Sequence, residues 1–267
     1  MARRTPEGPP PPPAVQKLRL RYTKRGRLRF TSHRDIARAF ERALRRARVP
    51  MAYSAGFSPH PKISWVGAAP TGVASEAEYV EISVVTVVDP DELRAALDAS
   101  LPQGIDVLEV VEASAGTSLP DRIVASHWGI RLPGVAPEQA ALAVSAFLDA
   151  GEIVVERLMK DGIRRLDARA PVVSMRVERA ADDLDCATLD LVVRHVTPAV
   201  RPDDVLSGLR SVADLVPPVP PEATRYAQGL LNETGGVADP LAPDRLVTPA
   251  PGATPAVDDT EAAVGAP

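Results

Sequence analysis

The sequence of 267 residues lacks the features of secreted, membrane and metal-cluster proteins. Its single cysteine, Cys186, excludes a disulfide within the chain and any zinc or iron–sulfur site built from several cysteines. No stretch has the length and apolar character of a membrane span. Prolines follow Arg3 and Arg4, where a signal peptide has its apolar core. These absences predict a cytoplasmic protein with no membrane contact, no metal and no cofactor.

Both ends of the chain have too few apolar residues to order themselves. Residues 5–13 are mostly proline, and residues 232–267 are rich in Pro, Ala, Gly, Thr and Asp without any periodicity. We therefore predict a disordered proline-rich N-terminus at 1–15, a first domain at 16–113, a linker at 114–123, a second domain at 124–231 and a disordered tail at 232–267.

The first domain follows the order strand, helix, strand, strand, helix, strand. Leu18, Leu20 and Tyr22 alternate with Lys17, Arg19 and Arg21, which predicts a half-buried strand with a basic outer face. The order is that of the ferredoxin-like βαββαβ fold, with an antiparallel sheet and both helices on one face. The remaining elements are expected as an extended segment at 27–30, a helix from Ser32 to Pro50, strands at 63–69 and 79–88, a helix from Pro90 and a strand at 105–111.

The second domain shows a similar order with a less regular strand count. An Asp161-Gly162 turn signal predicts an inserted hairpin around Asp161. The fold class is therefore α+β, with tandem ferredoxin-like domains and antiparallel sheets. The elements are expected as strands at 124–132, 153–158, 172–177, 189–193 and 223–231 and as helices at 137–151 and 203–212.

Positive charge is concentrated near the start of an acidic chain. Residues 1–62 hold sixteen Lys or Arg against three Asp or Glu, a net charge of +13, whereas the whole chain carries −4. A basic block on an acidic protein favours a face that meets a polyanion. The alternative is a solvated, arginine-rich surface without a ligand.

A basic stripe follows the first predicted helix. Ser32 and Asp35 form a variant of the capping box, and apolar residues at helical spacing mark the buried face. The stripe consists of Arg34, Arg38, Arg42 and Arg45, with Arg46 and Arg48 nearby. Guanidinium groups make bidentate contacts with phosphate, so this stripe indicates a nucleic-acid surface.

The loop after this helix adds groups suited to bases. Tyr53 and Phe57 offer rings for stacking on RNA bases, Gly56 allows close backbone approach, and Lys62 adds a charge. The alternative is that the prolines only stiffen the loop and that Phe57 belongs to the core. The predicted RNA-binding residues are Arg29, Arg34, Arg38, Arg42, Arg46, Tyr53, Ser54, Gly56, Phe57, His60 and Lys62.

Two histidines raise a catalytic alternative. A neutral histidine pair, His33 with His60, would carry out general acid–base cleavage of RNA if the rings met near a helix N-terminus. The simpler interpretation is that His33 caps the helix and His60 hydrogen-bonds within its loop. A metal site joining these histidines to Glu76 and Glu78 has no local ligand spacing to support it.

A long pattern of residues identifies a family. It comprises Leu28, Arg29, Phe30, Ser32, His33, Asp35, Glu41, Arg42, Ala43, Leu44, Arg46, Pro50, Tyr53, Ser54, Gly56, Phe57, Pro59, His60, Pro61, Lys62, Gly72, Val73, Ser75, Glu78 and Tyr79. On this pattern the chain resembles the radical-SAM-linked family of domains of unknown function, over residues 17 to about 230.

The resemblance implies a cellular context but no established activity. In some bacteria such a domain is fused behind a cobalamin-binding radical SAM protein. In actinobacteria it stands alone, often encoded beside a ribonuclease of the E/G type, so it implies one of these enzymes as a partner. The chain is not itself a radical SAM enzyme, because it lacks the three clustered cysteines.

Three functions compete at this stage. The favoured one is a non-enzymatic RNA-binding adaptor that presents tRNA or rRNA to a modification or processing enzyme. The second is an RNA endonuclease or modifying enzyme that uses His33 and His60. The third is a protein-interaction module whose basic face docks an acidic partner without RNA. All depend on the arginine stripe and the loop facing one open hollow.

Overall fold

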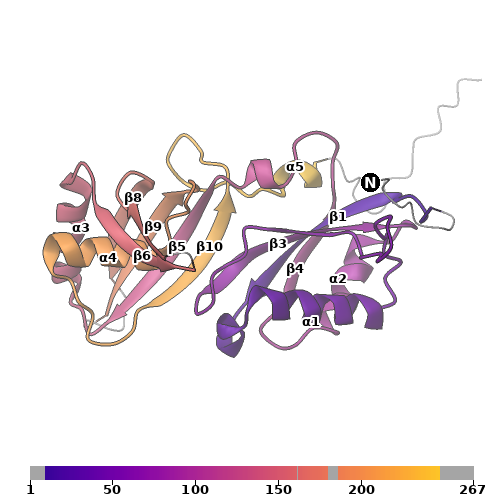
Figure 1. Cartoon of the computed structure of the whole chain (residues 1–267), viewed down its shortest axis with the longest axis horizontal. Helices are drawn as coiled ribbons and strands as arrows, with labels where there is room; N and C mark the ends of the chain where they lie inside the picture. The colour runs from indigo at the N-terminus through magenta and orange to yellow at the C-terminus, as the bar shows by residue number, and fades with distance from the viewer. Residues whose placement is uncertain (1–9, 161, 180–185, 247–267) are drawn as a thin grey trace, which may run out of the picture.

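The alternating apolar residues of the first half build four antiparallel strands that pack against two helices. The computed structural model describes residues 10–160, 162–179 and 186–246. The four strands lie in the order β4-β1-β3-β2, and α1 and α2 share one apolar core with them (Figure 1). The elements are β1 (Gln16–Lys24), α1 (His33–Arg46), β2 (Ile63–Val66), β3 (Ala74–Val84), α2 (Pro90–Asp98) and β4 (Val107–Glu112).

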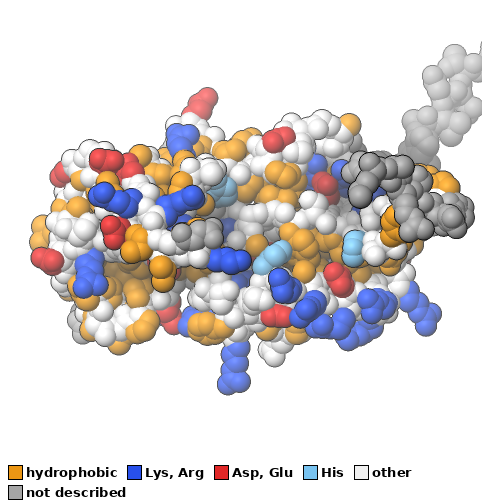
Figure 2. All heavy atoms as spheres, in the orientation of Figure 1, with side chains coloured by type: hydrophobic (Ala, Val, Ile, Leu, Met, Phe, Trp, Pro, Cys, Tyr) orange, Lys and Arg blue, Asp and Glu red, His pale blue; other side chains and the backbone are white. Residues whose placement is uncertain are grey.

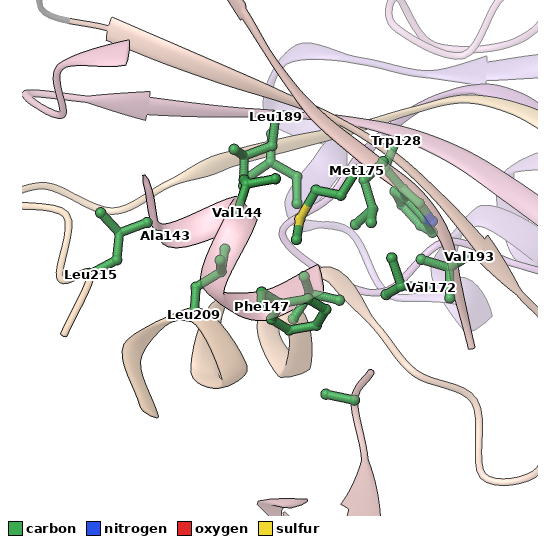
Figure 3. Packing of buried hydrophobic residues seen from close by; sticks show 14 of the residues in the cluster. Trp128, Ala143, Val144, Phe147, Val172, Met175, Leu189, Val193, Leu209 and Leu215 are labelled. Atoms are coloured by element: carbon green, nitrogen blue, oxygen red, sulfur yellow. The ribbon is translucent and has the colours of Figure 1, made fainter. Parts of the chain in front are cut away.

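The second half has its own core between a sheet and two helices (Figure 3). Its antiparallel strands lie in the order β10-β5-β9-β8. Gly208 allows α3 and α4 to approach closely, because a Cβ there would lie 2.7 Å from the Phe147 ring. The elements are β5 (Ala125–Pro133), α3 (Pro137–Asp149), β6 (Val154–Met159), β7 (Gly162–Asp167), β8 (Val172–Arg179), β9 (Cys186–Arg194), α4 (Pro202–Ala213) and β10 (Glu222–Gly229).

The two halves meet along one edge of β3. β10 pairs in parallel with β3 at Ala74 and Ser75, and β2 pairs with the same strand further along, at Tyr79–Ile82. Together the described strands make one eight-stranded sheet, with β6 and β7 as a separate hairpin. None of the described helices combines the length and the apolar character needed to cross a bilayer.

The predicted fold class is confirmed at the level of an α+β protein with a mostly antiparallel sheet. A hairpin is also found where the turn signal placed it, because β6 and β7 flank residue 161, which itself lies outside the described residues. The Ser32 cap is confirmed as well, since its hydroxyl accepts a hydrogen bond from the Asp35 N–H at 3.2 Å.

The segment predicted to be extended at 27–30 is a 3₁₀ helix, η1 (Gly26–Phe30). Gly26 takes the left-handed conformation (φ +54°), and the Leu28 N–H then donates to the Arg25 carbonyl at 3.1 Å. The extended prediction was therefore wrong, because a turn that begins with a left-handed glycine closes the chain more tightly than alternation suggests. α1 also ends at Arg46, before the expected stop at Pro50.

Part of the tail predicted to be disordered is ordered. Residues 232–246 continue from β10, and α5 (Ala242–Arg245) follows the fully buried Leu241. Asp244 is also fully buried and accepts hydrogen bonds from Arg19 (2.8 Å) and Arg122 (2.9 Å). Arg19, expected on a basic outer face, is therefore buried, because this segment covers its side of β1. Residues 1–9 and 247–267 lie outside the described part of the chain.

The predicted linker contains the 3₁₀ helix η2 (Pro120–Arg122) between the buried residues Leu119 and Ile123. The Ser114 hydroxyl and N–H both donate to Asp244, at 2.7 and 3.0 Å. The segment therefore packs into the protein together with the C-terminal helix.

Candidate nucleic-acid interface on helix α1

Helix α1 presents opposite chemistry on its two faces. Ile36, Phe40 and Leu44 are buried in the core of the first half, at the helical spacing that the sequence predicts. The charged side chains are exposed on the remaining surface, and Figure 2 shows a row of Lys and Arg side chains over this helix. The helix therefore displays its arginines to solvent along its whole length.

Most of the arginines on this helix are not neutralised. Arg34, Arg42 and Arg45, together with Arg48 just beyond its end, have no carboxylate within 4.0 Å among the described residues. Only Arg38 has one: it lies 3.5 Å from Asp35, and both side chains are largely exposed. We call these five arginines the α1 basic surface.

Two predicted contact residues lie elsewhere or are already bonded. Arg46 donates to the carbonyl of Ser100, which follows the end of α2, at 2.9 Å. Arg29 lies in η1, 4.8 Å from the Phe30 ring, and contacts Glu222 of β10 at 3.4 Å. Arg29 therefore belongs to the junction between the two halves, whereas Arg46 joins α1 to the segment after α2.

The loop from Tyr53 to Lys62 is closed by its own backbone. The Ser54 N–H donates to the His60 carbonyl at 2.8 Å, and the Ser54 hydroxyl accepts from the His60 N–H at 3.0 Å. Ser54 thus closes the loop with its backbone N–H and with its hydroxyl. Tyr53 and Phe57 are exposed, at 44% and 71% of their surfaces, so Phe57 is not part of the core. Gly56, at the loop tip, has a positive φ (+145°) and open space around it, and the Lys62 side chain is exposed.

A hollow of about 440 Å³ lies between the end of α1 and this loop. Its lining includes the buried residues Leu44 and Met51 and the exposed Tyr53. We call it the α1 hollow; its lining is Glu41, Leu44, Arg45, Arg48, Val49, Met51, Tyr53, Pro59 and Pro61.

The α1 hollow joins only part of the predicted site. Of the predicted RNA-binding residues, Tyr53 alone lines it, while Arg34, Arg38 and Arg42 lie on the α1 basic surface outside it. Glu41, Arg45 and Arg48 line it but were not among the predicted contacts. Helical spacing places Glu41 and Arg45 on one face, but the place of Arg48 depends on a left-handed backbone (φ +55°) that the sequence pattern does not reveal.

The two candidate catalytic histidines are not brought together. His33, at the start of α1, makes an edge contact with Trp65 of β2, with ring centroids 5.2 Å apart. His60 lies three residues before β2 begins, in the exposed loop. Among the described residues no hydrogen bond or ring contact joins the two imidazoles. The histidine pair therefore stays a prediction without geometric support.

The carboxylates considered for a metal site are already bound to arginine. Glu76 pairs with Arg25, and buried Glu78 pairs with buried Arg225. In residues 10–160, 162–179 and 186–246, no group of three His, Cys, Asp or Glu side chains is placed to hold a metal ion. Cys186 is buried.

A second cavity, of about 290 Å³, lies at the junction of the halves and was not foreseen from the sequence. Its lining includes Trp128 and Arg225, whose guanidinium carbon lies 5.3 Å from the Trp128 ring. His195 also lines it, held by Ser126 Oγ at 2.7 Å and by the Ile123 carbonyl at 3.1 Å. Desolvation of the ring lowers the pKa of His195, and the charge of Arg225 acts in the same direction.

Comparison with known proteins shows a family but no function. No curated protein matches the chain. A family model described as "Uncharacterized protein conserved in bacteria (DUF2344)" matches residues 17–202, more than half of the chain. Its description mentions no radical SAM protein, so that part of the resemblance stays a prediction. The chain belongs to the DUF2344 family of uncharacterized bacterial proteins.

Proposed function

We propose that this protein binds RNA through the α1 basic surface and acts as an accessory protein, not as an enzyme, in RNA modification or processing. One observation carries the proposal: Arg34, Arg42, Arg45 and Arg48 are exposed on one side of the molecule without a carboxylate within ion-pair distance among the described residues. Uncompensated guanidinium groups at this density attract a polyanion, and arginine binds phosphate bidentately.

The exposed rings beside this surface favour single-stranded or looped RNA over duplex. Tyr53 and Phe57 belong to the loop that adjoins the end of α1, and both rings are exposed in part, Phe57 more than Tyr53. Bases stack on such rings only where they are unpaired, and each stacked base contributes about 1–3 kcal/mol. The unpaired segments of tRNA or rRNA supply such bases.

A charge-reversal experiment tests the proposal. Binding of a labelled single-stranded RNA is measured by fluorescence anisotropy at several salt concentrations, for the wild type and for the double variant Arg42→Glu/Arg45→Glu. Affinity should fall about tenfold or more, since a hydrogen bond to a charged group contributes about 1.5–3 kcal/mol. The slope of log affinity against log salt should also become shallower, by roughly 0.7 for each phosphate that the variant no longer neutralises.

A matched double variant controls for net charge. Arg164 and Arg165 are also exposed but lie on β7 in the other half. Arg164→Glu/Arg165→Glu changes the net charge by the same amount and should leave affinity and salt dependence close to those of the wild type. Equal binding by the wild type and the Arg42→Glu/Arg45→Glu variant would rule out the α1 basic surface as the RNA contact.

The proposal extends to architecture and partners. The strand orders β4-β1-β3-β2 and β10-β5-β9-β8 support two ferredoxin-like units, with the β6–β7 hairpin inserted in the second.

The family resemblance supports a cytoplasmic radical SAM enzyme or a ribonuclease of the E/G type as the partner. Co-purification of either enzyme with the tagged protein, in an RNA-dependent manner, tests this part.

The catalytic alternative is tested separately. Because the histidine rings do not meet, we expect the purified protein to leave total RNA intact. Cleavage that disappears in a His33→Ala variant would instead make the protein a nuclease.

A further inference from the structure

The α1 hollow contains a carboxylate in the middle of a basic surface. Glu41 lines it beside Arg45 and Arg48. The Glu41 side chain is exposed, and no ion pair joins it to either arginine. A carboxylate at this place repels phosphate but offers two acceptor oxygens to a ligand that carries hydrogen-bond donors.

The volume and the lining of the hollow suit a nucleobase. Leu44, Val49 and Met51 supply apolar side chains, and Tyr53 supplies an aromatic one. Glu41 and the two arginines also line the hollow. A volume of about 440 Å³ lies within the usual range of small-molecule sites, about 300–1,000 Å³.

The backbone is strained where α1 ends at the hollow. The Arg48 N–H bonds to the Arg45 carbonyl at 3.1 Å, and the Val49 N–H bonds to the Leu44 carbonyl at 3.0 Å. This pair of bonds ends α1 in a Schellman motif, whose left-handed position glycine normally fills. Arg48 fills it at φ +55°, a conformation that is costly for a residue with a Cβ. The left-handed turn therefore places Arg48 and Val49 in the lining of the hollow.

We propose that the α1 hollow binds an unpaired guanine of the RNA. Glu41 accepts hydrogen bonds from guanine N1–H and N2–H₂, Tyr53 stacks on the base, and Arg45 and Arg48 hold the adjoining phosphates. Guanine is selected because its Watson–Crick edge presents two adjacent donors, which match the two oxygens of a carboxylate. Adenine, cytosine and uracil each present only one donor group there. This inference rests on the proposed RNA binding and gives it a base specificity.

Oligonucleotides that differ in one base test the specificity. Anisotropy measurements compare otherwise identical adenine-rich RNAs carrying guanine, inosine or adenine at the central position. Inosine lacks only the N2 amino group, so it removes one of the two donors. The wild type should prefer guanine to both by roughly 5- to 150-fold, the discrimination expected of a bidentate base contact.

Substitution of the carboxylate identifies the group responsible. Glu41→Gln should lose the preference for guanine over inosine while keeping or increasing its affinity for the adenine RNA, because a repulsive charge is removed. Glu152→Gln, at an exposed position of the second half, is the control and should keep the preference. A wild type that binds the three RNAs equally would overturn the guanine site but leave RNA binding by the α1 basic surface standing.

The strained arginine gives a second, independent readout. Arg48→Gly should raise the melting temperature by roughly 2–4 °C, through relief of the left-handed backbone, and should weaken binding of the guanine RNA severalfold. Asp214, the other described non-glycine residue with positive φ, ends α4 in the second half, so Asp214→Gly should raise the melting temperature without changing RNA affinity. If Arg48→Gly gains stability and binds guanine RNA as the wild type does, Arg48 is not a ligand contact and that part of the proposal fails.

Discussion

Two sets of arginines in this protein have opposite environments. Arg19, Arg122 and Arg225 are almost fully buried, and each contacts a buried carboxylate, Asp244 or Glu78. The arginines of the α1 basic surface are exposed, and four of the five have no carboxylate within 4.0 Å in the described part of the chain. A buried charge must be paired because its desolvation is strongly unfavourable, whereas a solvated one need not be.

Only part of the positive charge in residues 1–62 is available to a ligand, because some of its basic groups are bound within the fold. The surplus of +13 in residues 1–62 counts all basic groups alike. Several of them are bound within the fold: Arg19 to Asp244, Arg25 to Glu76, and Lys24 to the Pro70 carbonyl at 2.9 Å. The unbound charge is therefore more concentrated on α1 than the sequence indicates.

The largest effect is expected at the junction of the halves. Arg225→Met leaves Glu78 buried without its partner, which should lower the free energy of unfolding by about 3–5 kcal/mol. Urea denaturation measures this loss. Arg165→Met removes an exposed arginine that pairs with the exposed Glu156 and should cost at most about 1 kcal/mol. Equal losses in the two variants would contradict the distinction between buried and exposed arginines.

The C-terminal segment should show the next largest effect. Leu241 is fully buried beside the Arg19–Asp244 pair, so Leu241→Ala should lower the free energy of unfolding by about 2–5 kcal/mol. Leu246, only five residues later, is 88% exposed, and Leu246→Ala should have almost no effect. A neutral Leu241→Ala variant would mean that this segment does not stabilise the fold.

The sequence could predict features that depend on local periodicity. The apolar spacing of Ile36, Phe40 and Leu44 places α1 on the core, and the same 3.6-residue period places its arginines outside. The strands of the main sheet, and the helices α1 to α4 that pack on it, were expected within a few residues of their observed bounds. The α+β class follows from that order.

Features that depend on distant partners could not be predicted. Arg19 and Asp244 are 225 residues apart, and Arg225 and Glu78 are 147 apart, so no local pattern relates them. For the same reason residues 232–246 were predicted to be disordered, because their few apolar side chains contact residues that are distant in the sequence. The α1 hollow likewise depends on the left-handed turn at Arg48 and on loop closure by Ser54.

His195 should have a smaller effect on stability, and this effect should depend on pH. The pKa of its ring is lower in the folded protein than the ordinary 6.5, so the unfolded chain binds a proton more readily. The contribution of this group to stability is therefore complete above about pH 6.5 and is lost as the pH falls below it, by at most about 1.4 kcal/mol per pH unit. Comparison of urea denaturation at pH 7.5 and 5.5 should show a smaller difference for His195→Asn than for the wild type. An unchanged difference would mean that the ring is not desolvated.

The smallest change in stability is expected on the α1 basic surface, because its arginines are exposed, whereas Arg225 at the junction is buried. Arg38, Arg42 and Arg46 follow one another at four-residue steps, and like charges at this spacing destabilise a helix by about 0.2–0.5 kcal/mol per pair. Arg42→Glu replaces two repulsions by two attractions, so urea denaturation should find the variant unchanged or slightly more stable than the wild type. A loss above about 1 kcal/mol would make Arg42 a structural residue. A stable Arg42→Glu variant that no longer binds RNA would instead show that the helix carries this charge for its ligand, at a small expense to its own stability.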